Sequence, residues 1–279
     1  MSHSTIKLLS ILAIVAAALG IAASAAASVR DLTPSISSNW AGYAVGDTSV
    51  ISGGATPAAD PLTFTSVTAT WVQPKAVCTT ATSPSYSAFW VGLGGFSIGA
   101  QALEQIGTES DCLAGGLPDY FAWYELVPAP STRINLRIRP GDLITTSVNI
   151  NGTDVLVQVK NRTLRTSFTR HLQMAAPDLT SAEWIAEAPS ACSSLNRCSV
   201  LPLADFGSVA FTRIASIANG HGGTLTDPAW LSEAIRLVPS ATLRSPPFAT
   251  QASTAGAVPG SVSPDGRIFD VSWLPNANN

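Results

Sequence analysis

Apolar and polar residues alternate with a period of two along several segments of the chain. Residues 134–139 read Ile-Asn-Leu-Arg-Ile-Arg, and residues 155–159 carry Val at every second position. Successive side chains of a strand point to opposite faces, so this alternation predicts strands with one apolar face. Residues 88–93 form an apolar run that ends at two glycines, which predicts a further strand.

Frequent turns separate these segments. Asn151-Gly152 and Asp265-Gly266 are hairpin turn signals, and Pro140-Gly141-Asp142 is a third turn. The predicted strands are residues 67–72, 88–93, 121–127, 134–139, 143–150, 155–159 and 268–273. Short strands joined by many turns indicate an all-β protein, either an antiparallel sandwich or a barrel.

Helix signals are sparse. Asp227-Pro228 has the composition of a helix start, which predicts a helix over residues 229–237, although the end of this stretch fits a strand equally well. Residues 47–60 are rich in Gly, Ala, Thr and Pro and are predicted to form a surface loop. We find no internal repeat and no linker between residues 37 and 273, so we expect one domain.

The first 27 residues have the composition of a secretory signal peptide. A short segment with one Lys is followed by an apolar run and by small residues that suit peptidase cleavage. A membrane anchor is the alternative, but no basic cluster flanks the run. We therefore expect a signal peptide over residues 1–27, a short N-terminal segment over 28–38, one domain over 39–274 and a disordered tail over 275–279.

The charge of the chain argues against nucleic-acid binding. Only 12% of residues are charged, against about 25% in an average soluble chain. The formal net charge is −3, and loss of Lys7 with the signal peptide leaves 14 basic against 18 acidic residues. This balance lacks the basic excess that a phosphate backbone requires. We expect a secreted, extracellular protein that binds no nucleic acid and no membrane once the signal peptide is removed.

Four cysteines in a secreted chain indicate two disulfides. Cys192 and Cys198 enclose five mostly polar residues and can close a local loop, which leaves Cys78 to pair with Cys112. A metal site is not expected, because the sequence has no C-x-x-C motif and no His near these cysteines.

One sequence motif of serine hydrolases is present. Residues 95–99 match G-x-S-x-G, which would make Ser97 a nucleophile. That mechanism also needs a helix after the Ser, a parallel sheet and a later His, whereas the chain reads as antiparallel β. The two histidines outside the signal peptide are His171 and His221. A Gly-rich turn after a strand is the simpler interpretation.

Several carboxylates lie on apolar strands. Glu183 and Glu187 are four residues apart, so they point to the same face of a strand. Glu125 lies between Tyr124 and Leu126. Buried carboxylates are costly unless they are paired or functional. The alternative is that these acids face solvent on the outer side of a sheet.

The order of six segments resembles the eqolisins, a family of glutamic peptidases with a Gln/Glu dyad. The segments are Ser-Asn-Trp-Ala-Gly (38–42), Trp-Val-Gly-Leu-Gly-Gly (90–95), Ala-Leu-Glu-Gln-Ile-Gly-Thr-Glu (102–109), Tyr-Phe-Ala-Trp-Tyr-Glu (120–125), Ala-Glu-Trp-Ile-Ala-Glu (182–187) and Leu-Ala-Asp-Phe-Gly-Ser-Val-Ala-Phe-Thr (203–212). The resemblance implies an antiparallel β-sandwich of two curved sheets with the active site on the concave face of one. It also implies a monomeric enzyme that acts on polypeptides without a metal or cofactor.

The resemblance also implies roles for individual residues. The catalytic pair falls on Gln105 and Glu187. A Glu carboxylate can take a proton from water, and an amide N–H can donate to the oxyanion that forms on the substrate. The predicted substrate-binding residues are Trp90, Trp123, Glu109 and Glu125.

The chain departs from the fungal family members at three positions around this site. Gly94 and Phe121 stand where those enzymes have acids, and Glu109 stands where they have Asp. With an unperturbed Glu as the base, we expect a bell-shaped pH profile with a maximum at roughly pH 3–5.

Two other functions remain open at this stage. A lectin-like binding module would use an aromatic concave face that carries Trp90, Trp123 and Trp184. A glycosidase would use Glu125 and Glu187 as its carboxylate pair.

Overall fold

The computed structural model describes residues 34–53, 61–79, 83–97, 99–194, 197–239 and 254–277. The predicted signal peptide and residues 28–33 lie outside the described residues. All described residues belong to one compact unit. None of their helices has the length and apolar character that a membrane span requires.

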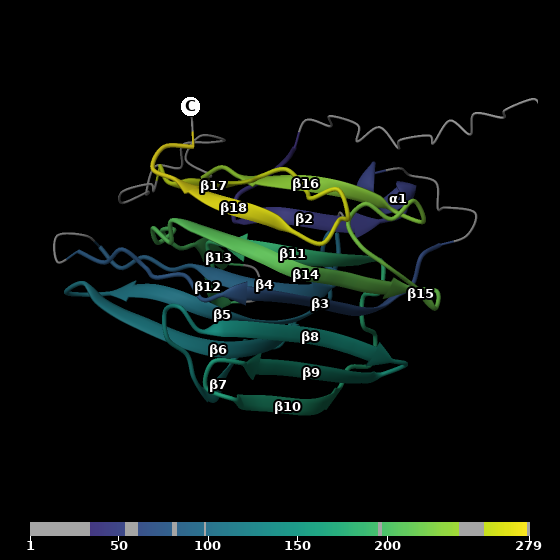
Figure 1. The fold of residues 1–279 in the computed structure, drawn as a ribbon, viewed down its shortest axis with the longest axis horizontal. Helices are drawn as coiled ribbons and strands as arrows, with labels where there is room; N and C mark the ends of the chain where they lie inside the picture. The colour runs from purple at the N-terminus through teal and green to yellow at the C-terminus, as the bar shows by residue number, and fades with distance from the viewer. Residues whose placement is uncertain are drawn as a thin grey trace, which may run out of the picture. The chain divides into compact units, whose positions relative to one another are not determined.

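Strands account for nearly all regular structure of the described residues (Figure 1). They are β1 (Ser35–Ser37), β2 (Trp40–Gly46), β3 (Phe64–Val72), β4 (Ala88–Leu93), β5 (Leu103–Leu113), β6 (Leu117–Val127), β7 (Thr132–Arg137), β8 (Leu143–Asn151), β9 (Asp154–Asn161), β10 (Thr166–Gln173), β11 (Ser181–Glu187), β12 (Ser190–Ser194), β13 (Arg197–Val200), β14 (Ser208–Ala218), β15 (His221–Gly223), β16 (Leu231–Leu237), β17 (Gly256–Pro259) and β18 (Phe269–Leu274).

The strands form two antiparallel layers that share one strand. The first layer has the order β18-β17-β16-β2-β11-β4-β5-β6-β7, and the second has the order β10-β9-β8-β3-β14. The start of β14 pairs with β18, and its later part pairs with β3, so this strand crosses from one layer to the other. The predicted all-β sandwich is confirmed, with its two layers continuous through β14.

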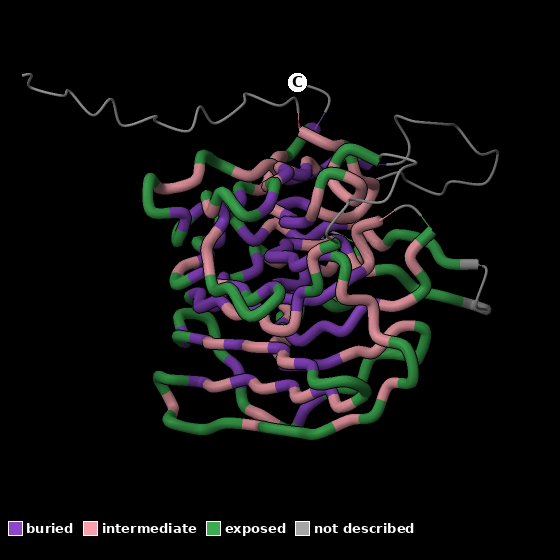
Figure 2. Tube along the Cα trace, turned by 90° about the vertical axis from the view of Figure 1, so that its right-hand side faces the viewer, coloured by how far each residue is buried: buried purple, intermediate pink, exposed green. Residues whose placement is uncertain are grey.

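The hydrophobic core lies between the two layers (Figure 2). Two tryptophans connect the layers and are fully buried there. Trp184 on β11 donates its indole N–H to the carbonyl of Thr68 on β3 at 2.9 Å. Trp71 on β3 donates to the hydroxyl of Thr108 on β5 at 3.1 Å. Each bond satisfies a polar group that burial would otherwise leave unpaired.

All seven predicted strands are present. Of the two interpretations of residues 229–237, the helix is wrong, and the strand at the end of the stretch is confirmed. This stretch contains β16, which pairs with β2 and buries every second side chain. The apolar alternation of the strand outweighs the Asp-Pro start signal. Residues 47–60 include a short helix, α1 (Thr48–Ile51), whose first N–H groups donate to Asp47. Residues 54–60 of this predicted loop lie outside the described residues.

The described part of the predicted disordered tail packs against the domain. Ala277 is buried, and its N–H donates to the carbonyl of Thr254 at 2.9 Å. Arg236 on β16 donates to the carbonyl of Ala277. Residues 278–279 lie outside the described residues.

Both predicted disulfides are confirmed. Cys78 is joined to Cys112 at the end of β5, and Cys192 to Cys198 across the hairpin of β12 and β13. The hairpin follows β11 directly, so the second disulfide closes a loop a few residues after Glu187.

Removal of the first disulfide should destabilise the protein more than removal of the second. The paired cysteines are 34 and 6 residues apart, so loop-closure entropy gives about 4 and about 2 kcal/mol respectively. We expect the double variant Cys78→Ser/Cys112→Ser to unfold at a lower denaturant concentration than Cys192→Ser/Cys198→Ser. The reverse order would show that local packing, and not loop length, governs their contributions.

Two glutamates are fully buried in the first layer. Glu104 on β5 and Glu183 on β11 have no exposed surface. Burial raises the pKa of Glu104 to about 8, partly offset by the backbone N–H of Asp178. Burial also raises the pKa of Glu183 well above its usual value. Both side chains are therefore held protonated in the folded protein at weakly acidic pH.

These two groups should make the protein less stable as pH rises. A buried acid with a raised pKa keeps its proton while the unfolded chain loses it, so the free energy of unfolding falls between pH 4.5 and about 8. Glu104→Gln and Glu183→Gln should each raise the melting temperature at pH 7 by several degrees relative to wild type. At pH 4 this gain should nearly vanish, and an equal gain at both pH values would contradict the assignment.

Candidate active site

Strand pairing places the candidate residues on one face of the first layer. One row of directly opposed residues runs across five strands, from β11 to β7: Glu187, Ala88, Glu109, Phe121 and Arg137. Two residues further along the strands, the next row consists of Ile185, Trp90, Gly107, Trp123 and Arg133. All these side chains share one face, because the rows are two positions apart on β11, β4, β5 and β6, and on β7 Arg137 and Arg133 lie directly opposite Phe121 and Trp123.

Gln105 lies in the third row of this face. It is opposite Gly92 on β4 and Glu125 on β6, and Gly92 is opposite Glu183. Gln105 and Glu187 therefore lie on either side of the row that contains Trp90 and Gly107. The register of β11, β4, β5 and β6 thus brings together the acids and the amide that lie far apart in the sequence.

Gly107 permits close packing at the centre of this face. A Cβ at this position would lie 2.3 Å from the carbonyl oxygen of Phe89 and 2.6 Å from the Cβ of Trp90. Both distances are shorter than van der Waals contact, so any larger residue would displace Trp90. Displacement of Trp90 would in turn disturb Glu187, which accepts a hydrogen bond from the indole N–H of Trp90.

Two N–H donors hold the carboxyl group of Glu187. Trp90 Nε1 donates to Oε2 at 2.7 Å, and Asn39 Nδ2 donates to Oε1 at 2.9 Å. Trp40 packs edge-on against Trp90 with ring centroids 5.0 Å apart. Burial raises the pKa of Glu187 to about 7; the bonds from Trp90 and Asn39 oppose this rise, and the charge of Glu125 adds to it. Because both oxygens accept N–H groups, the bonds favour the ionised form.

One hydrogen bond fixes the orientation of the Gln105 amide. Its Nε2 donates to Glu125 Oε2 at 2.7 Å, and its Oε1 is buried without a partner among the described residues. The amide nitrogen carries two hydrogens, so a second N–H remains available. Burial raises the pKa of Glu125, and the bond from Gln105 partly offsets this rise.

A second pair of acids lies beside Glu187. Asp111 is two residues after Glu109 on β5, so both point to the same face, and protonated Glu109 donates a hydrogen bond to Asp111. Burial and the charge of Asp111 raise the pKa of Glu109, and burial raises that of Asp111. The charge of Arg133 opposes both shifts. The pair therefore retains a proton well above the pH at which a free carboxyl loses it.

The three aromatic residues of the predicted site are all buried. Trp90 and Trp123, predicted to contact substrate, are 0% and 4% exposed, and Trp90 holds Glu187 instead. Trp184 faces the opposite side, inside the core between the layers. The aromatic face that a lectin-like module requires is therefore not formed. The alternative of solvent-facing acids is wrong for Glu183, which is fully buried.

The described residues do not assemble a serine hydrolase site. Ser97 lies in a turn that the N–H of Ala100 closes, and β5 follows in place of a helix. His171 Nδ1 lies 2.9 Å from Asp154, and His221 Nε2 lies 2.9 Å from Asp227. Both histidines are exposed. Within the described residues, no three His, Cys, Asp or Glu side chains are placed to hold a metal ion.

Three residues of this site were not singled out from the sequence. Asn39 was part of a recognised segment but had no assigned role. Asp111 lies two residues after Glu109, so it would have been placed on the same face had the strand over residues 103–113 been predicted. Arg133 gave no signal, because its proximity to the acids depends on the pairing of β6 with β7.

The fold is similar to those of glutamic peptidases of known structure. Scytalido-glutamic peptidase bound to a peptide-based transition state analogue has a TM-score of 0.60 at 23% identity, over 85% of this chain and 98% of that chain. SCP-B, a member of the eqolisin family bound to the tripeptide Ala-Ile-His, has a TM-score of 0.58 at 22% identity, with the same shares covered. Aspergilloglutamic peptidase from Aspergillus niger has a TM-score of 0.51 at 26% identity, over 68% of this chain and 99% of that chain.

Comparison of sequences gives the family directly. No curated protein sequence matches the chain. The sequence model of the Peptidase A4 family, to which the eqolisins belong, matches residues 38–242, well over half of the chain. This span contains all three rows of the site face and every predicted site residue. The chain is therefore a member of the Peptidase A4 family of peptide-bond hydrolases.

Proposed function

We propose that this protein is a secreted endopeptidase that hydrolyses peptide bonds with Gln105 and Glu187 as its catalytic pair. The observation that carries the proposal is the arrangement of these two side chains on one face, each held by its own neighbours. Trp90 and Asn39 hold Glu187, and Glu125 holds Gln105. The N-terminal sequence and the two disulfides support secretion, because disulfides persist in oxidising compartments.

Glu187 acts as the general base and then as the general acid. Its carboxylate takes a proton from the water that attacks the scissile carbonyl carbon. The protonated carboxyl then gives this proton to the leaving amine, and the C–N bond breaks. Two N–H bonds keep the carboxylate in one orientation, so little reorganisation is needed during the reaction.

Gln105 stabilises the oxyanion and positions the water. Its Nε2 uses one hydrogen for Glu125, and the second N–H can donate to the developing oxyanion. Its Oε1 has no partner among the described residues and can accept a hydrogen bond from the attacking water. Glu125 thereby acts as a positioning residue, because it determines which end of the amide faces the substrate.

The glycosidase alternative fits this arrangement less well. That mechanism needs both Glu125 and Glu187 to face the scissile bond. Glu125 instead accepts a hydrogen bond from Gln105, an amide that glycoside hydrolysis does not require. Cleavage of protein without cleavage of oligosaccharides would exclude it.

Substitution of either catalytic residue should abolish peptidase activity without unfolding the protein. Glu187→Gln removes the base, and Gln105→Ala removes the oxyanion donor, so each should lower kcat/KM by at least roughly 10²-fold. Digestion of a denatured protein measures the loss, and circular dichroism checks the fold. Gln158→Ala, at a half-buried position on β9 of the other layer, is the matched control and should retain activity.

A residual rate above about a tenth of wild type in either variant would contradict the catalytic pair. Pepstatin should leave the wild-type activity intact, since no paired catalytic aspartates are used. Inactivation by a serine-directed reagent would favour Ser97 instead.

The pH profile should respond in opposite directions to two substitutions. Activity falls as pH drops through the pKa of Glu187, because the base must be ionised. Burial raises this pKa to about 7, so the expected maximum moves above the pH 3–5 predicted from an unperturbed Glu. Trp90→Phe removes an N–H that favours the carboxylate, so the acid limb should move about one pH unit higher. Glu125→Gln removes a repelling charge, so the acid limb should move lower.

The measurement is kcat/KM against pH for wild type and both variants. Shifts of the same sign in the two variants, or no shift in either, would remove Glu187 as the group that sets the acid limb. An alkaline limb that moves with Glu125→Gln would identify Glu125 as the acid that must stay protonated.

A further inference from the structure

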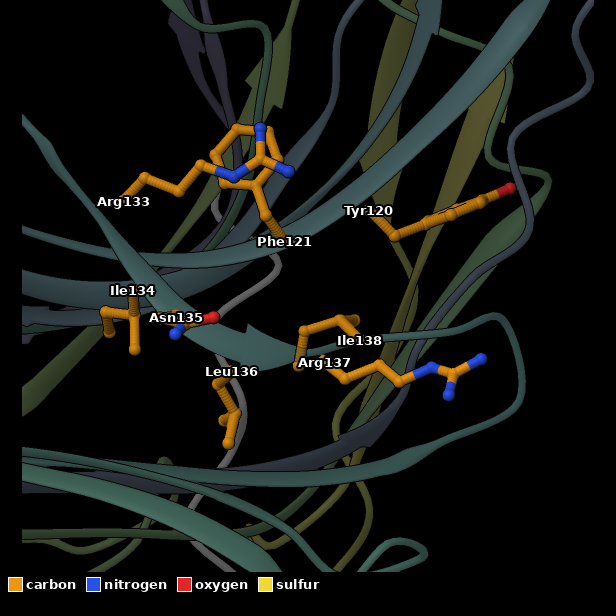
Figure 3. A pocket seen from close by; sticks show the side chains of 8 residues that line it. All are labelled: Tyr120, Phe121, Arg133, Ile134, Asn135, Leu136, Arg137 and Ile138. Carbon is orange, nitrogen blue, oxygen red and sulfur yellow. The ribbon is translucent and has the colours of Figure 1, made fainter.

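A cavity lies where the row that contains Glu187 reaches the margin of the layer. On β6 and β7, Phe121 is opposite Arg137 and Ala122 is opposite Ile134, so two extra residues of β7 form a bulge between these pairs. The cavity at this bulge has a volume of about 480 Å³. Its lining includes Phe121, Arg133 and Arg137 (Figure 3).

Two guanidinium groups border this cavity. Arg133 lies 4.0 Å above the centroid of the Phe121 ring and forms two hydrogen bonds to Asp119, at 2.9 and 3.0 Å. Arg137 is exposed, and its guanidinium has no partner among the described residues. Figure 3 shows Arg133 against Phe121 on one side of the cavity and Arg137 extending from the end of β7. Arg137 therefore has unused hydrogen-bond donors at the border of a cavity that Phe121 also lines.

The charge at this margin is opposite to that of the rest of the face. Glu187, Glu109, Asp111 and Glu125 lie toward the catalytic pair, whereas Arg133 and Arg137 lie at the outer end. Asp119 pairs with Arg133, so the unpaired positive charge of this margin is that of Arg137. Basic side chains of a substrate would be attracted to the acids, and acidic ones would be repelled by them. The bulge is thus the part of the site face that favours an acidic group.

We propose that this cavity is a specificity subsite that binds an acidic side chain of the peptide substrate. The aliphatic part of a Glu or Asp side chain would pack on Phe121, and its carboxylate would pair with Arg137. A guanidinium neighbour lowers the pKa of a carboxyl, so the bound side chain stays ionised at acidic pH. The role of this subsite in substrate choice rests on the proposed function.

Strand spacing sets the position of this side chain relative to the scissile bond. Adjacent strands are ~4.8 Å apart, so the two to three strands between the catalytic pair and the bulge span roughly 10–14 Å. An extended peptide advances about 3.4 Å per residue. The preferred acidic residue should therefore lie about three or four residues from the scissile bond, on one side of it.

The test uses fluorogenic peptides that differ at one position. Each of the third and fourth positions on either side of the cleavage site carries Glu, Gln, Leu or Lys in turn. We expect Glu to exceed Gln in kcat/KM by about 3–10-fold at one of these positions, as for a partly exposed charge pair. Arg137→Glu should reverse the order, with Lys favoured over Glu, and added salt should weaken both preferences.

Arg139→Glu is the matched control. This arginine is also exposed and follows β7, but it does not line the cavity and lies 3.7 Å from Asp142. The substitution Arg139→Glu makes the same change in net charge as Arg137→Glu and should leave the preference for Glu peptides unaltered. Equal cleavage of the Glu and Gln peptides, a preference for Leu, or the same effect from Arg139→Glu and Arg137→Glu would overturn the proposal.

A binding measurement separates the failure of this proposal from the failure of the proposed function. Fluorescence anisotropy of the Glu and Gln peptides with Glu187→Gln reports binding without cleavage. Tighter binding of the Glu peptide that Arg137→Glu abolishes would support the subsite even if wild type cleaved no peptide. Cleavage by wild type with equal binding of both peptides would retain the proposed function and remove the subsite.

Discussion

The hydrogen bond from the indole N–H of Trp90 to Glu187 is the interaction on which the site depends. A carboxylate that loses contact with water is destabilised unless donors replace the water molecules. Trp90 can supply such a donor only because β4 lies beside β11 in this register and because Gly107 on β5 leaves space for its Cα and Cβ atoms. Asn39, which precedes β2, supplies the other donor. Residues from four segments of the chain therefore determine the state of one carboxyl group.

Burial has opposite consequences for the acids of the first layer. Glu187 has two N–H donors, so it can ionise within an accessible pH range and serve as a base. Glu183, on the same strand and face, is fully buried, and burial raises its pKa well above its usual value. The spacing of four residues placed both on one face, but only the neighbouring strands decide which one can carry a charge. The same sequence pattern thus gives a catalytic candidate and a structural acid.

The sequence was sufficient for the architecture, because alternation and turn residues are local signals, and the order of six segments was sufficient to indicate the family and to select the candidate site residues. The sequence was insufficient where the pairing of distant strands determines the secondary structure or the neighbours of a side chain. Residues 229–237 have a helix start signal, yet pairing with β2 makes them a strand. Trp184 was expected on an aromatic face of the site. It is adjacent to Ile185, whose side chain lies on the site face, so the side chain of Trp184 points to the opposite face and into the core. Arg133 could be placed beside the acids only once the bulge between β6 and β7 was known.

The acids of the site and those of the interior act against each other as pH changes. In the proposed mechanism activity increases as Glu187 ionises, and the pKa of this group is raised to about 7. Over the same pH range the free energy of unfolding falls. The unfolded chain loses a proton that Glu104 of the folded protein keeps up to about pH 8. Both effects arise from burial in the first layer. Strand β5 carries Glu109 of the site and the interior Glu104, and β11 carries Glu187 of the site and the interior Glu183. The working range is therefore limited below by the chemistry of Glu187 and above by the stability of the fold, and a substitution at an interior glutamate should extend the upper limit without touching the catalytic pair.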